Sequence, residues 1–408
     1  MEEAFEKEMG IREKTLADYR KEFQIVKVSG SYVIKSCKGT NPTVIIPGNI
    51  KGIPVQIAEG AFRGTNHIQT VYIDDGFKHI TDHAFEDCTN LQSIIIPDSV
   101  TSIGSDAFRD CTSLQSITIP DSVMSIGYDA FRGCTSLQSI NIPDSVTNIG
   151  TNAFLGCKGL SDANEMVIVQ NILFDYLGQS SDVVIPEGVT EIRSAFRKCS
   201  NLQSITFPNS VKTLSGAFSD CTNLQSINIP DSVTSIGYRA FSWCENLREI
   251  TIGNGISRIE KETFSFCTSL KSINIPDSVT SIGYEAFYNC KNLQSISISN
   301  SVTEIRDSAF KNCESLREVT IGNGVTSINE STFKNCTSLR SITIPDSVTS
   351  IGIMAFDWTF LRNITIPDSV TSIGYKAFAN CGNLTIHAPA GSYAEQYAKE
   401  NNYKFQAL

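Results

Sequence analysis

Cysteine and histidine are the residues of this chain whose side chains could coordinate a metal, form disulfides or act in nucleophilic catalysis. The 408 residues include 13 Cys and 4 His. An odd number of cysteines rules out a complete set of disulfides within one chain. Zinc sites usually contain closely paired cysteines such as C-x-x-C, and no such pair occurs here. The spacing of the cysteines therefore has to be explained in another way.

Twelve of the cysteines follow a Phe by three residues, and most recur every 22 or 23 residues. A fixed period of this length indicates a solenoid rather than the two or three domains that the length alone would suggest. We call these twelve the ladder cysteines: Cys88, Cys111, Cys134, Cys157, Cys199, Cys221, Cys244, Cys267, Cys290, Cys313, Cys336 and Cys381. Thr359 takes one further position of the series, and 14 Phe anchors from Phe62 to Phe378 mark 14 repeats.

One repeat contains two short segments with strand character. In residues 97–119, Leu114, Ile117 and Ile119 form L-x-x-I-x-I, which alternates at its end as a strand does. Residues 100–103 form a second, shorter β-branched segment. One coil of this kind cannot bury both faces of its own strands. Stacked coils would pair them as parallel sheets with steps of about 4.8 Å.

The remaining part of the repeat is expected to turn the chain. Phe108 begins a predicted helical or 3-10 turn that carries Cys111 inward. Stacking would then place Phe on Phe and Cys on Cys, and the ladder cysteines would pack as small buried hydrophobes. Cys37 alone lies outside the ladder and is the one thiol expected to be exposed. It has no His close in sequence, and Lys35 and Lys38 could lower its pKa slightly.

The repeated pattern I-P-x-S-V-x-x-I-x-x-x-A-F-x-x-C-x-x-L-x-x-I resembles the leucine-rich repeats of the BspA-like (Treponema) type over residues 40–389. Asp74, Gly253, Ser299 and Gly322 depart from it where Pro is usual. The predicted fold class is a β-rich leucine-rich repeat solenoid of about 14 repeats of 22–23 residues, with caps at both ends. The resemblance implies a protein-binding scaffold with a role in adhesion to host or cell-surface proteins.

Five segments are expected along the chain. Residues 1–22 form an amphipathic helix, interpreted as a lid on the first coil, with a docking helix as the alternative. Residues 23–47 form an N-terminal capping hairpin, and residues 48–389 form the solenoid. A hairpin at 160–186 interrupts it, either as a re-initiation within one rigid solenoid or as a weak boundary between two arrays. Residues 390–408 form the C-terminal cap.

The two ends of the chain give further signals. Ser392 and Glu395 predict a capping box, with the Ser as N-cap and the Glu reaching back to it. The acidic N-terminus has no apolar segment typical of a signal peptide. As it stands, the sequence therefore indicates a cytoplasmic location, whereas the resemblance implies a secreted or cell-surface protein.

Two departures from the repeat pattern are candidate partner-binding residues. One is a set of aromatic residues between the Phe and Cys anchors, where other repeats are mostly polar, and they could lie exposed or fold back on the adjacent turn. The other is a basic series directly after the Leu anchor, where the first half of the chain has Gln, with a solvated face as the alternative. The aromatic set is Trp243, Phe266, Tyr288 and Trp358, and the basic set is Arg248, Lys271, Arg317, Arg340 and Arg362.

No residue pattern indicates catalysis, a metal or a cofactor. His79 and His83 are four residues apart, but the repeat places them around a short strand rather than on one helical face. A net charge of −10 argues against nucleic acid as the partner, and no apolar run is long enough to enter a membrane. We therefore expect a monomeric, non-enzymatic scaffold that binds a protein partner. A self-associating structural protein is the alternative, and an enzyme-linked or regulatory sensor the less favoured one.

Overall fold

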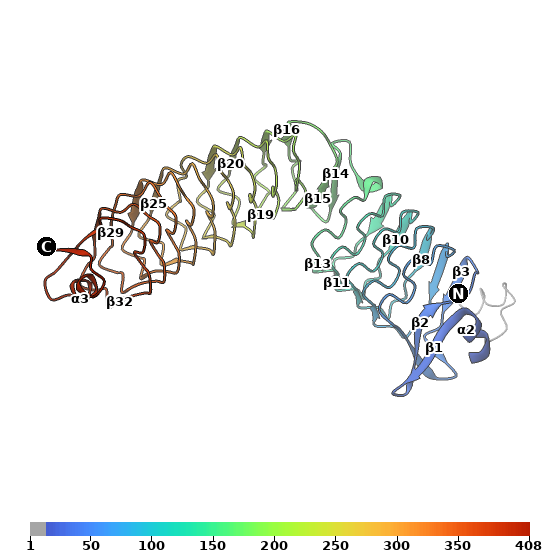
Figure 1. The fold of residues 1–408 in the computed structure, drawn as a ribbon. Coiled ribbons are helices and arrows are strands. Elements are labelled where there is room, and N and C mark those ends of the chain that lie inside the picture. The colour runs from blue at the N-terminus through green and yellow to red at the C-terminus, as the bar shows by residue number, and fades with distance from the viewer. Residues whose placement is uncertain (1–13) are drawn as a thin grey trace. The chain divides into compact units, whose positions relative to one another are not determined.

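The chain divides into two compact units in the computed structural model, which describes residues 14–408. Unit 1 extends to Gln170 and includes Phe174–Gly178, whereas unit 2 comprises Asn171–Leu173 and Gln179–Leu408. Each unit is a stack of coils made of short parallel strands joined by turns (Figure 1). The division falls within the predicted interrupting hairpin.

Unit 1 begins with a short helix and an antiparallel hairpin. Helix α2 (Leu16–Glu22) starts with a capping box between Thr15 and Asp18, whose hydrogen bonds lower the pKa of the Asp18 carboxyl to about 2. The part of the expected helix that precedes Lys14 lies outside the described residues. Strands β1 (Phe23–Val28) and β2 (Ser31–Cys37) pair as predicted. Phe23 then covers the ring of Phe62 edge-on at 5.9 Å.

The coils of unit 1 stack in register through two columns of parallel strands. One column aligns Val44, Val71 and Ile94, and the other aligns Ile80 with its equivalents in the next coils. The strands are β3 (Thr43–Ile46), β4 (Asn49–Ile50), β5 (Ile53–Ile57), β6 (Thr70–Ile73), β7 (His79–Ile80), β8 (Ser93–Ile95), β9 (Ser102–Ile103), β10 (Ser116–Thr118), β11 (Ser125–Ile126), β12 (Ser139–Asn141), β13 (Asn148–Ile149), β14 (Met166–Val169) and β15 (Ile172–Tyr176). A 3-10 helix, η1 (Lys158–Leu160), precedes β14, and β15 is divided between the units.

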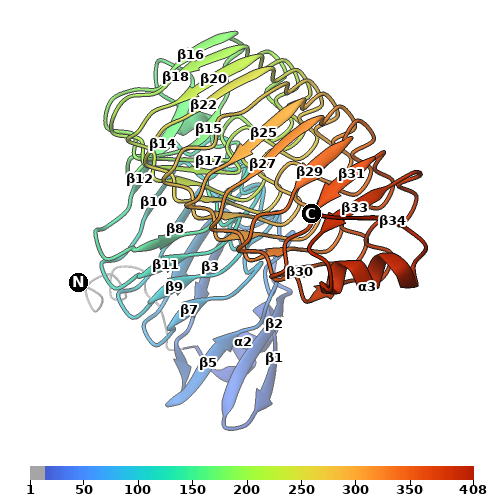
Figure 2. The same cartoon turned by 90° about the vertical axis from the view of Figure 1, so that its left-hand side faces the viewer.

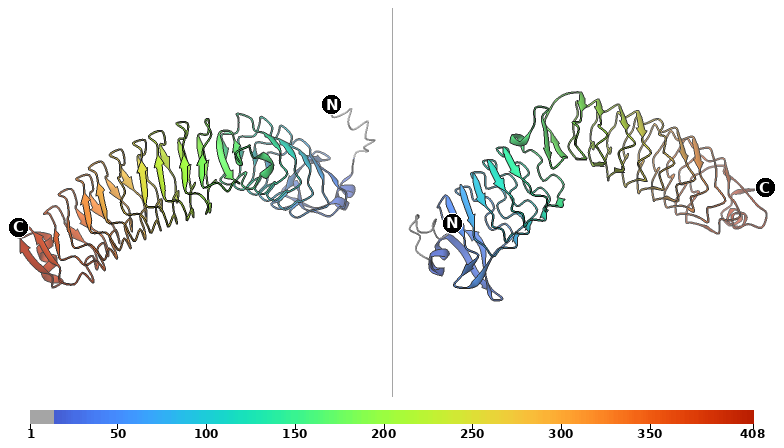
Figure 3. Two further views of the ribbon diagram at one scale, coloured as in Figure 1. Left: turned by 90° about the horizontal axis from the view of Figure 1, so that it is seen from above. Right: turned by 180° about the vertical axis from the view of Figure 1, so that it is seen from behind.

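Unit 2 repeats the same arrangement over more coils. Its longer strands lie side by side in chain order, from β25 to β34 in Figure 2, and Figure 3 shows the same stacking from two further sides. The strands are β16 (Asp182–Val184), β17 (Glu191–Arg193), β18 (Ser204–Thr206), β19 (Thr213–Ser215), β20 (Ser226–Ile229), β21 (Ser235–Ile236), β22 (Glu249–Ile252), β23 (Arg258–Ile259), β24 (Ser281–Ile282), β25 (Ser295–Ile298), β26 (Glu304–Ile305), β27 (Glu318–Ile321), β28 (Ser327–Ile328), β29 (Ser341–Thr343), β30 (Ser350–Ile351), β31 (Asn363–Thr365), β32 (Ser372–Ile373), β33 (Thr385–Ala388) and β34 (Lys404–Ala407).

Stacked phenylalanines form the centre of each unit, as predicted. From Phe62 to Phe154 in unit 1, and from Phe196 to Phe378 in unit 2, successive rings lie 5.0–5.5 Å apart and within 19° of parallel. These anchor rings have no solvent exposure. Burying one aromatic ring per coil is a large hydrophobic contribution, so the Phe columns set the position of each coil.

The ladder cysteines do more than fill space. In eleven coils the thiol is buried and donates a hydrogen bond of 2.9–3.2 Å to the carbonyl oxygen of the Phe anchor in the preceding coil. The remaining ladder residue, Cys199, is only half-buried. The sequence predicts that Cys37 is the one exposed thiol. This prediction is wrong, because among the described residues both Cys37 and Cys199 are partly accessible.

The segment between the two strand columns differs from the expected helical or 3-10 turn. It consists of consecutive turns, because two residues in each coil adopt left-handed backbone angles, such as Asp106 (φ 53°) and Asp110 (φ 56°). With this geometry the amides of Asp106, Phe108 and Asp110 all donate to carbonyls of the next coil. The turns thus join coil to coil much as the strands do.

The C-terminal cap has the predicted helix and last strand but a different capping interaction. Helix α3 (Tyr393–Glu400) has Ser392 as its N-cap, whose hydroxyl accepts from the Glu395 amide. The Glu395 carboxylate accepts from the Gly391 amide at 2.6 Å, so the predicted reciprocal bond to Ser392 is wrong. Tyr397 covers the final Phe378 ring at 6.0 Å. No helix within residues 14–408 has the length and apolar character to cross a bilayer.

Burial controls the acid–base behaviour of the ladder. It raises the pKa of the Cys88, Cys157 and Cys290 thiols to about 12, mainly because a buried thiolate would lose its hydration. These thiols are therefore protonated at neutral pH. In that form they can donate to the Phe carbonyls, and they are poor nucleophiles and metal ligands.

Alkaline pH should destabilise both units. Between the pKa of an unfolded thiol, near 9, and the folded value of about 12, the folded chain holds more protons than the unfolded chain. Stability should therefore be complete below pH 9 and fall as pH rises, by about 1.4 kcal/mol per pH unit for each such thiol. Urea unfolding under reducing conditions at neutral and alkaline pH measures this. Equal midpoints on both sides of pH 9 would contradict a buried ladder.

Candidate partner-binding surface

The residue directly before each ladder Cys has a backbone conformation that suits few side chains. Its φ is positive, and most coils place Asp, Asn or Gly there, as at Asp110, Asn289 and Gly133. Trp243 (φ 64°) and Phe266 (φ 62°) occupy the same position. A left-handed backbone is a genuine outlier for a bulky side chain, and for most residues it costs roughly 1–2 kcal/mol. These two aromatics are therefore not explained by the needs of the turn.

The structure brings three of the predicted aromatic residues together on unit 2. The rings of Trp243 and Phe266 stack with centroids 3.8 Å apart and planes 7° from parallel. Tyr288 meets Phe266 edge-on at 5.3 Å. Trp243 is 42% exposed, while Phe266 and Tyr288 are half-buried. We call these three residues the aromatic cluster.

A second aromatic column flanks the cluster and contains a lysine that the sequence analysis missed. Tyr238, Lys261 and Tyr284 are equivalent residues of three successive coils, and both tyrosines are exposed. The Lys261 ammonium lies 5.7 Å from the Tyr238 ring and 5.2 Å from the Tyr284 ring. The lysine is thus held between two rings by cation–π attraction. The sequence does contain a signal for this contact, because Lys261 lies 23 residues from each of the two tyrosines.

The basic residues predicted after the Leu anchor form one exposed column on unit 2. Backbone bonds from Arg317 to Gln294 and from Gln294 to Lys271 keep neighbouring members in register at about 4.8 Å per coil. None of the five has a carboxylate within 4.0 Å in the described part of the chain, although Glu249 and Glu318 are the next residues along. We call Arg248, Lys271, Arg317, Arg340 and Arg362 the basic column.

Trp358 does not join the aromatic cluster. It occupies the same turn position as Trp243, but five coils farther along, which is about 24 Å at the spacing of neighbouring strands. Its neighbour Phe360, which the sequence analysis missed, is 49% exposed and lies beneath the Arg340 guanidinium at 5.2 Å. Phe360 could have been found because the equivalent residues are Ser or Asn, such as Ser338 and Asn292.

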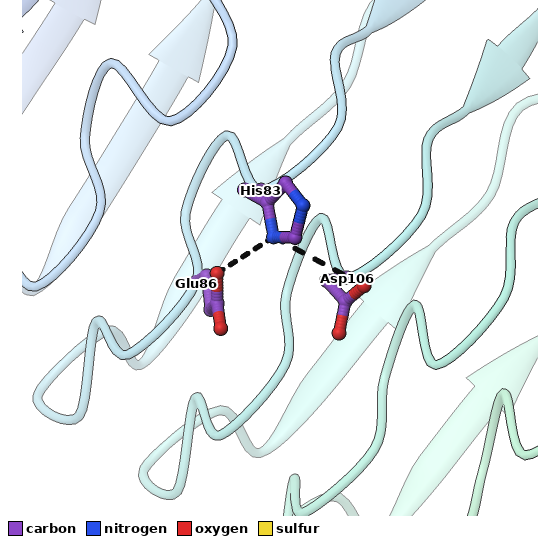
Figure 4. Close-up of side chains that lie close together, drawn as sticks. All are labelled: His83, Glu86 and Asp106. Atoms are coloured by element: carbon purple, nitrogen blue, oxygen red, sulfur yellow. Dashed lines mark hydrogen bonds and ion pairs between the residues drawn. The ribbon is translucent and has the colours of Figure 1, made fainter.

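His79 and His83, which the sequence analysis does not assign to a metal site, have different hydrogen-bond partners. In unit 1, His83 Nδ1 is 2.7 Å from Glu86 Oε2 and 4.0 Å from Asp106 Oδ2 (Figure 4). Arg63 contacts the same Glu86 oxygen at 3.2 Å, and Arg109 lies 3.1 Å from the other Asp106 oxygen. The carboxylates are therefore already paired with two guanidinium groups. The arrangement is best described as a salt-bridge network, and His79 bonds separately to Ser102.

Cys37 differs from its expected environment in two respects. Its sulfur lies 3.9 Å from His67 Nε2, although the two residues are 30 positions apart in sequence. Burial, rather than the neighbouring lysines, dominates its acidity and raises the pKa of the thiol. The expectation of a lowered pKa was therefore wrong, and a His that is distant in sequence lies near the thiol. A half-buried thiol with a raised pKa is not an activated nucleophile.

Comparison with known proteins points to one repeat family. The model of the BspA type leucine-rich repeat region matches residues 28–164, 167–290 and 257–385. Among solved structures, a leucine-rich repeat protein from Bacteroides ovatus is 30% identical, with 95% of this chain and 98% of that one covered and a TM-score of 0.49. A leucine-rich cell-surface protein from Faecalibacterium prausnitzii is 29% identical, with 92% and 95% covered and a TM-score of 0.40. No curated protein matches the chain.

Replacing the two strained aromatics with asparagine should not weaken unit 2. The variant Trp243→Asn/Phe266→Asn introduces the residue that other coils use at this turn, so stability should be unchanged or rise by up to about 1 kcal/mol. The buried anchor variant Phe264→Ala, by contrast, should lose about 3–5 kcal/mol. Urea unfolding compares the three proteins. A loss above about 1 kcal/mol in the asparagine variant would show that the cluster is structural.

Proposed function

This chain belongs to the BspA-type leucine-rich repeat family, and from that premise we propose that it is a non-enzymatic scaffold that binds protein partners. The observation that supports this proposal most is the aromatic cluster. Trp243 and Phe266 stand in strained turn positions where other coils carry Asp, Asn or Gly. Their stacking on each other offsets part of this strain, and we infer that contact with another molecule accounts for the choice of aromatic residues.

The chemistry of the proposed surface fits a protein partner. Tryptophan, tyrosine and arginine dominate the binding energy of protein interfaces because they bury much surface and lose little side-chain entropy. The proposed partner-binding residues are the aromatic cluster, Trp358 and the basic column. All of them lie on unit 2, which has a rigid backbone of in-register coils. A partner would therefore meet side chains that are already positioned.

Adhesion is the finer form of the proposal. The family resemblance implies recognition of host or cell-surface proteins, and a partner at a cell surface is the assignment we favour. The proposal includes no enzymatic step, because the aromatic cluster and the basic column contain no nucleophile paired with a base.

The binding test compares the wild-type chain with Trp243→Asn/Phe266→Asn. Both proteins are immobilised and incubated with biotin-labelled surface proteins of cultured animal cells. Proteins captured by the wild type are then purified and measured individually by surface plasmon resonance. We expect affinity for such a partner to fall at least about tenfold in the variant, because hot-spot aromatics contribute 2 kcal/mol or more.

A matched control changes the same turn position without touching an aromatic residue. Asn312→Asp lies beyond the aromatic cluster, in the same left-handed conformation, and should bind as the wild type does. Equal binding by the asparagine variant and the wild type would remove the aromatic cluster from the proposal.

Self-association is the alternative function, and the open edge of β34 is the feature that would favour it. This strand pairs with β33 on one side only, and its exposed Lys404 is the kind of charge that blocks edge-to-edge pairing. We therefore expect light scattering to give the mass of a monomer at every concentration measured. A mass that rises with concentration would favour the structural role instead.

A further inference from the structure

The coil that contains Trp358 departs from the repeat at three consecutive residues, and it has one residue before Leu361 where neighbouring coils have two between the Cys and Leu anchors. Trp358 has φ 58° where neighbouring coils have Asn335 and Asn380. Thr359 replaces the ladder Cys, and its hydroxyl donates to Phe356 in its own coil at 2.8 Å instead of to the preceding coil. Phe360 stands at a position where Asn246, for example, bonds to the preceding coil at 2.8 Å.

Trp358 has a backbone conformation that is unfavourable for a bulky side chain, and Phe360 has a contact with the Arg340 guanidinium in place of the usual polar bond to the preceding coil. Trp358 is 52% exposed and Phe360 49% exposed, so neither ring is buried in the coil stack. Thr359 between them is fully buried, which leaves the two rings on the outer surface of one coil. Departures of this kind, concentrated in one coil, mark a functional surface rather than a structural need.

A positive charge lies over one of the two rings, and a second follows it in sequence. The Arg340 guanidinium lies 5.2 Å above the Phe360 ring, and Arg362 is the second residue after it. Both arginines are exposed, and within residues 14–408 neither has a carboxylate within 4.0 Å. The acidic residue of this turn, Asp357, is buried and already bonded to Lys334 and Asn380, each at 2.9 Å.

The two arginines also belong to the same column of neighbouring coils. The Arg362 amide donates to the Arg340 carbonyl at 2.8 Å, which fixes the two backbones side by side. Like charges in register on neighbouring strands repel each other. Arg340 donates to the Thr337 carbonyl at 2.7 Å and stacks on Phe360, but within residues 14–408 no carboxylate neutralises either arginine. An anionic ligand would relieve this repulsion. The net charge of the whole chain is −10, so this positive rim is a local feature.

We propose that Trp358, Phe360, Arg340 and Arg362 bind an acidic polypeptide segment that also carries apolar side chains. The rings would contact the apolar side chains, and each guanidinium would pair with a carboxylate in a planar, two-bond geometry. This inference rests on the proposed scaffold function but concerns a surface five coils from the aromatic cluster. An anionic polysaccharide is the competing ligand, and it is an outcome of the test.

The test uses three fluorescent peptides with the same alternating Leu and Phe residues, separated by Glu, by Gln or by Lys. Fluorescence anisotropy with the full chain should show the Glu peptide binding about tenfold or more tightly than the Gln peptide, and more weakly as salt increases. The Lys peptide should not bind. Equal binding of the Glu and Gln peptides would overturn the proposal.

Variants that restore the usual repeat residues provide the decisive comparison. Trp358→Asn/Phe360→Ser introduces the residue types of Asn335 and Ser338, so this variant should fold. Its affinity for the Glu peptide should be about tenfold lower than that of the wild type. Arg340→Gln/Arg362→Gln introduces the residue found at Gln294 and should remove the preference for Glu over Gln. Thermal unfolding checks that both variants are folded. Unchanged binding by either folded variant would overturn the proposal.

Two further measurements separate this surface from the aromatic cluster and from carbohydrate binding. Trp243→Asn/Phe266→Asn should bind the Glu peptide as the wild type does, and loss of binding would place the peptide at the aromatic cluster and overturn the inference. Heparin fragments should compete only weakly. A different result would be that heparin binds, that its binding requires the two arginines but not the two rings, and that no peptide binds. This result would overturn the polypeptide ligand in favour of an anionic polysaccharide. Neither result would bear on partner capture by the aromatic cluster.

Discussion

The hydrogen bond that eleven of the twelve ladder thiols donate to the Phe carbonyl of the preceding coil is, together with the Phe columns, the contact on which the coil stacks depend. The carbonyl of Phe108, for example, accepts from the Cys111 amide of its own coil and from the Cys134 thiol of the next. A buried carbonyl oxygen with two acceptor sites is then fully satisfied. Cysteine suits this position because it is small and apolar enough to be buried and still carries a donor.

The surface of the protein follows from this repeated contact. Because Phe and Cys determine where each coil lies, the left-handed turn positions project residues at a constant step along the stack. Most coils fill these positions with Asp, Asn or Gly, which tolerate the conformation. The coils with Trp or Phe there depart from this pattern, which is why we propose them as partner-binding sites. Unit 2 carries both the aromatic cluster and the Trp358 surface in this way.

Much of the fold could be predicted from the period alone, because residues 22 or 23 apart in a solenoid become neighbours. This reasoning located the Phe columns, the ladder, both hairpins and the contact of Trp243 with Phe266. It also anticipated the C-terminal helix, but not that Glu395 bonds to Gly391. The choice between two adjacent amides depends on backbone angles that residue types do not specify.

The features that escaped prediction have more than one physical cause. Cys37 meets His67 across 30 residues, between the capping hairpin and the first repeat, where no constant spacing applies. Lys261 and Phe360 lie in columns that contain no buried anchor, so the anchor pattern alone does not identify them. The thiol hydrogen bonds were hidden because burial predicts that Cys packs as a hydrophobe but not where its proton points.

The central claim is that the hydrogen-bonded ladder thiols are structural and closed to solvent. Thiol titration of the folded protein with a chromogenic disulfide reagent tests this claim most directly. The eleven hydrogen-bonded thiols are buried, and only Cys37 and Cys199 are half-accessible among the 13 cysteines. We predict at most two fast-reacting thiols in the folded chain and reaction of all 13 after unfolding in urea. Fast reaction of more than two thiols before unfolding would contradict the account.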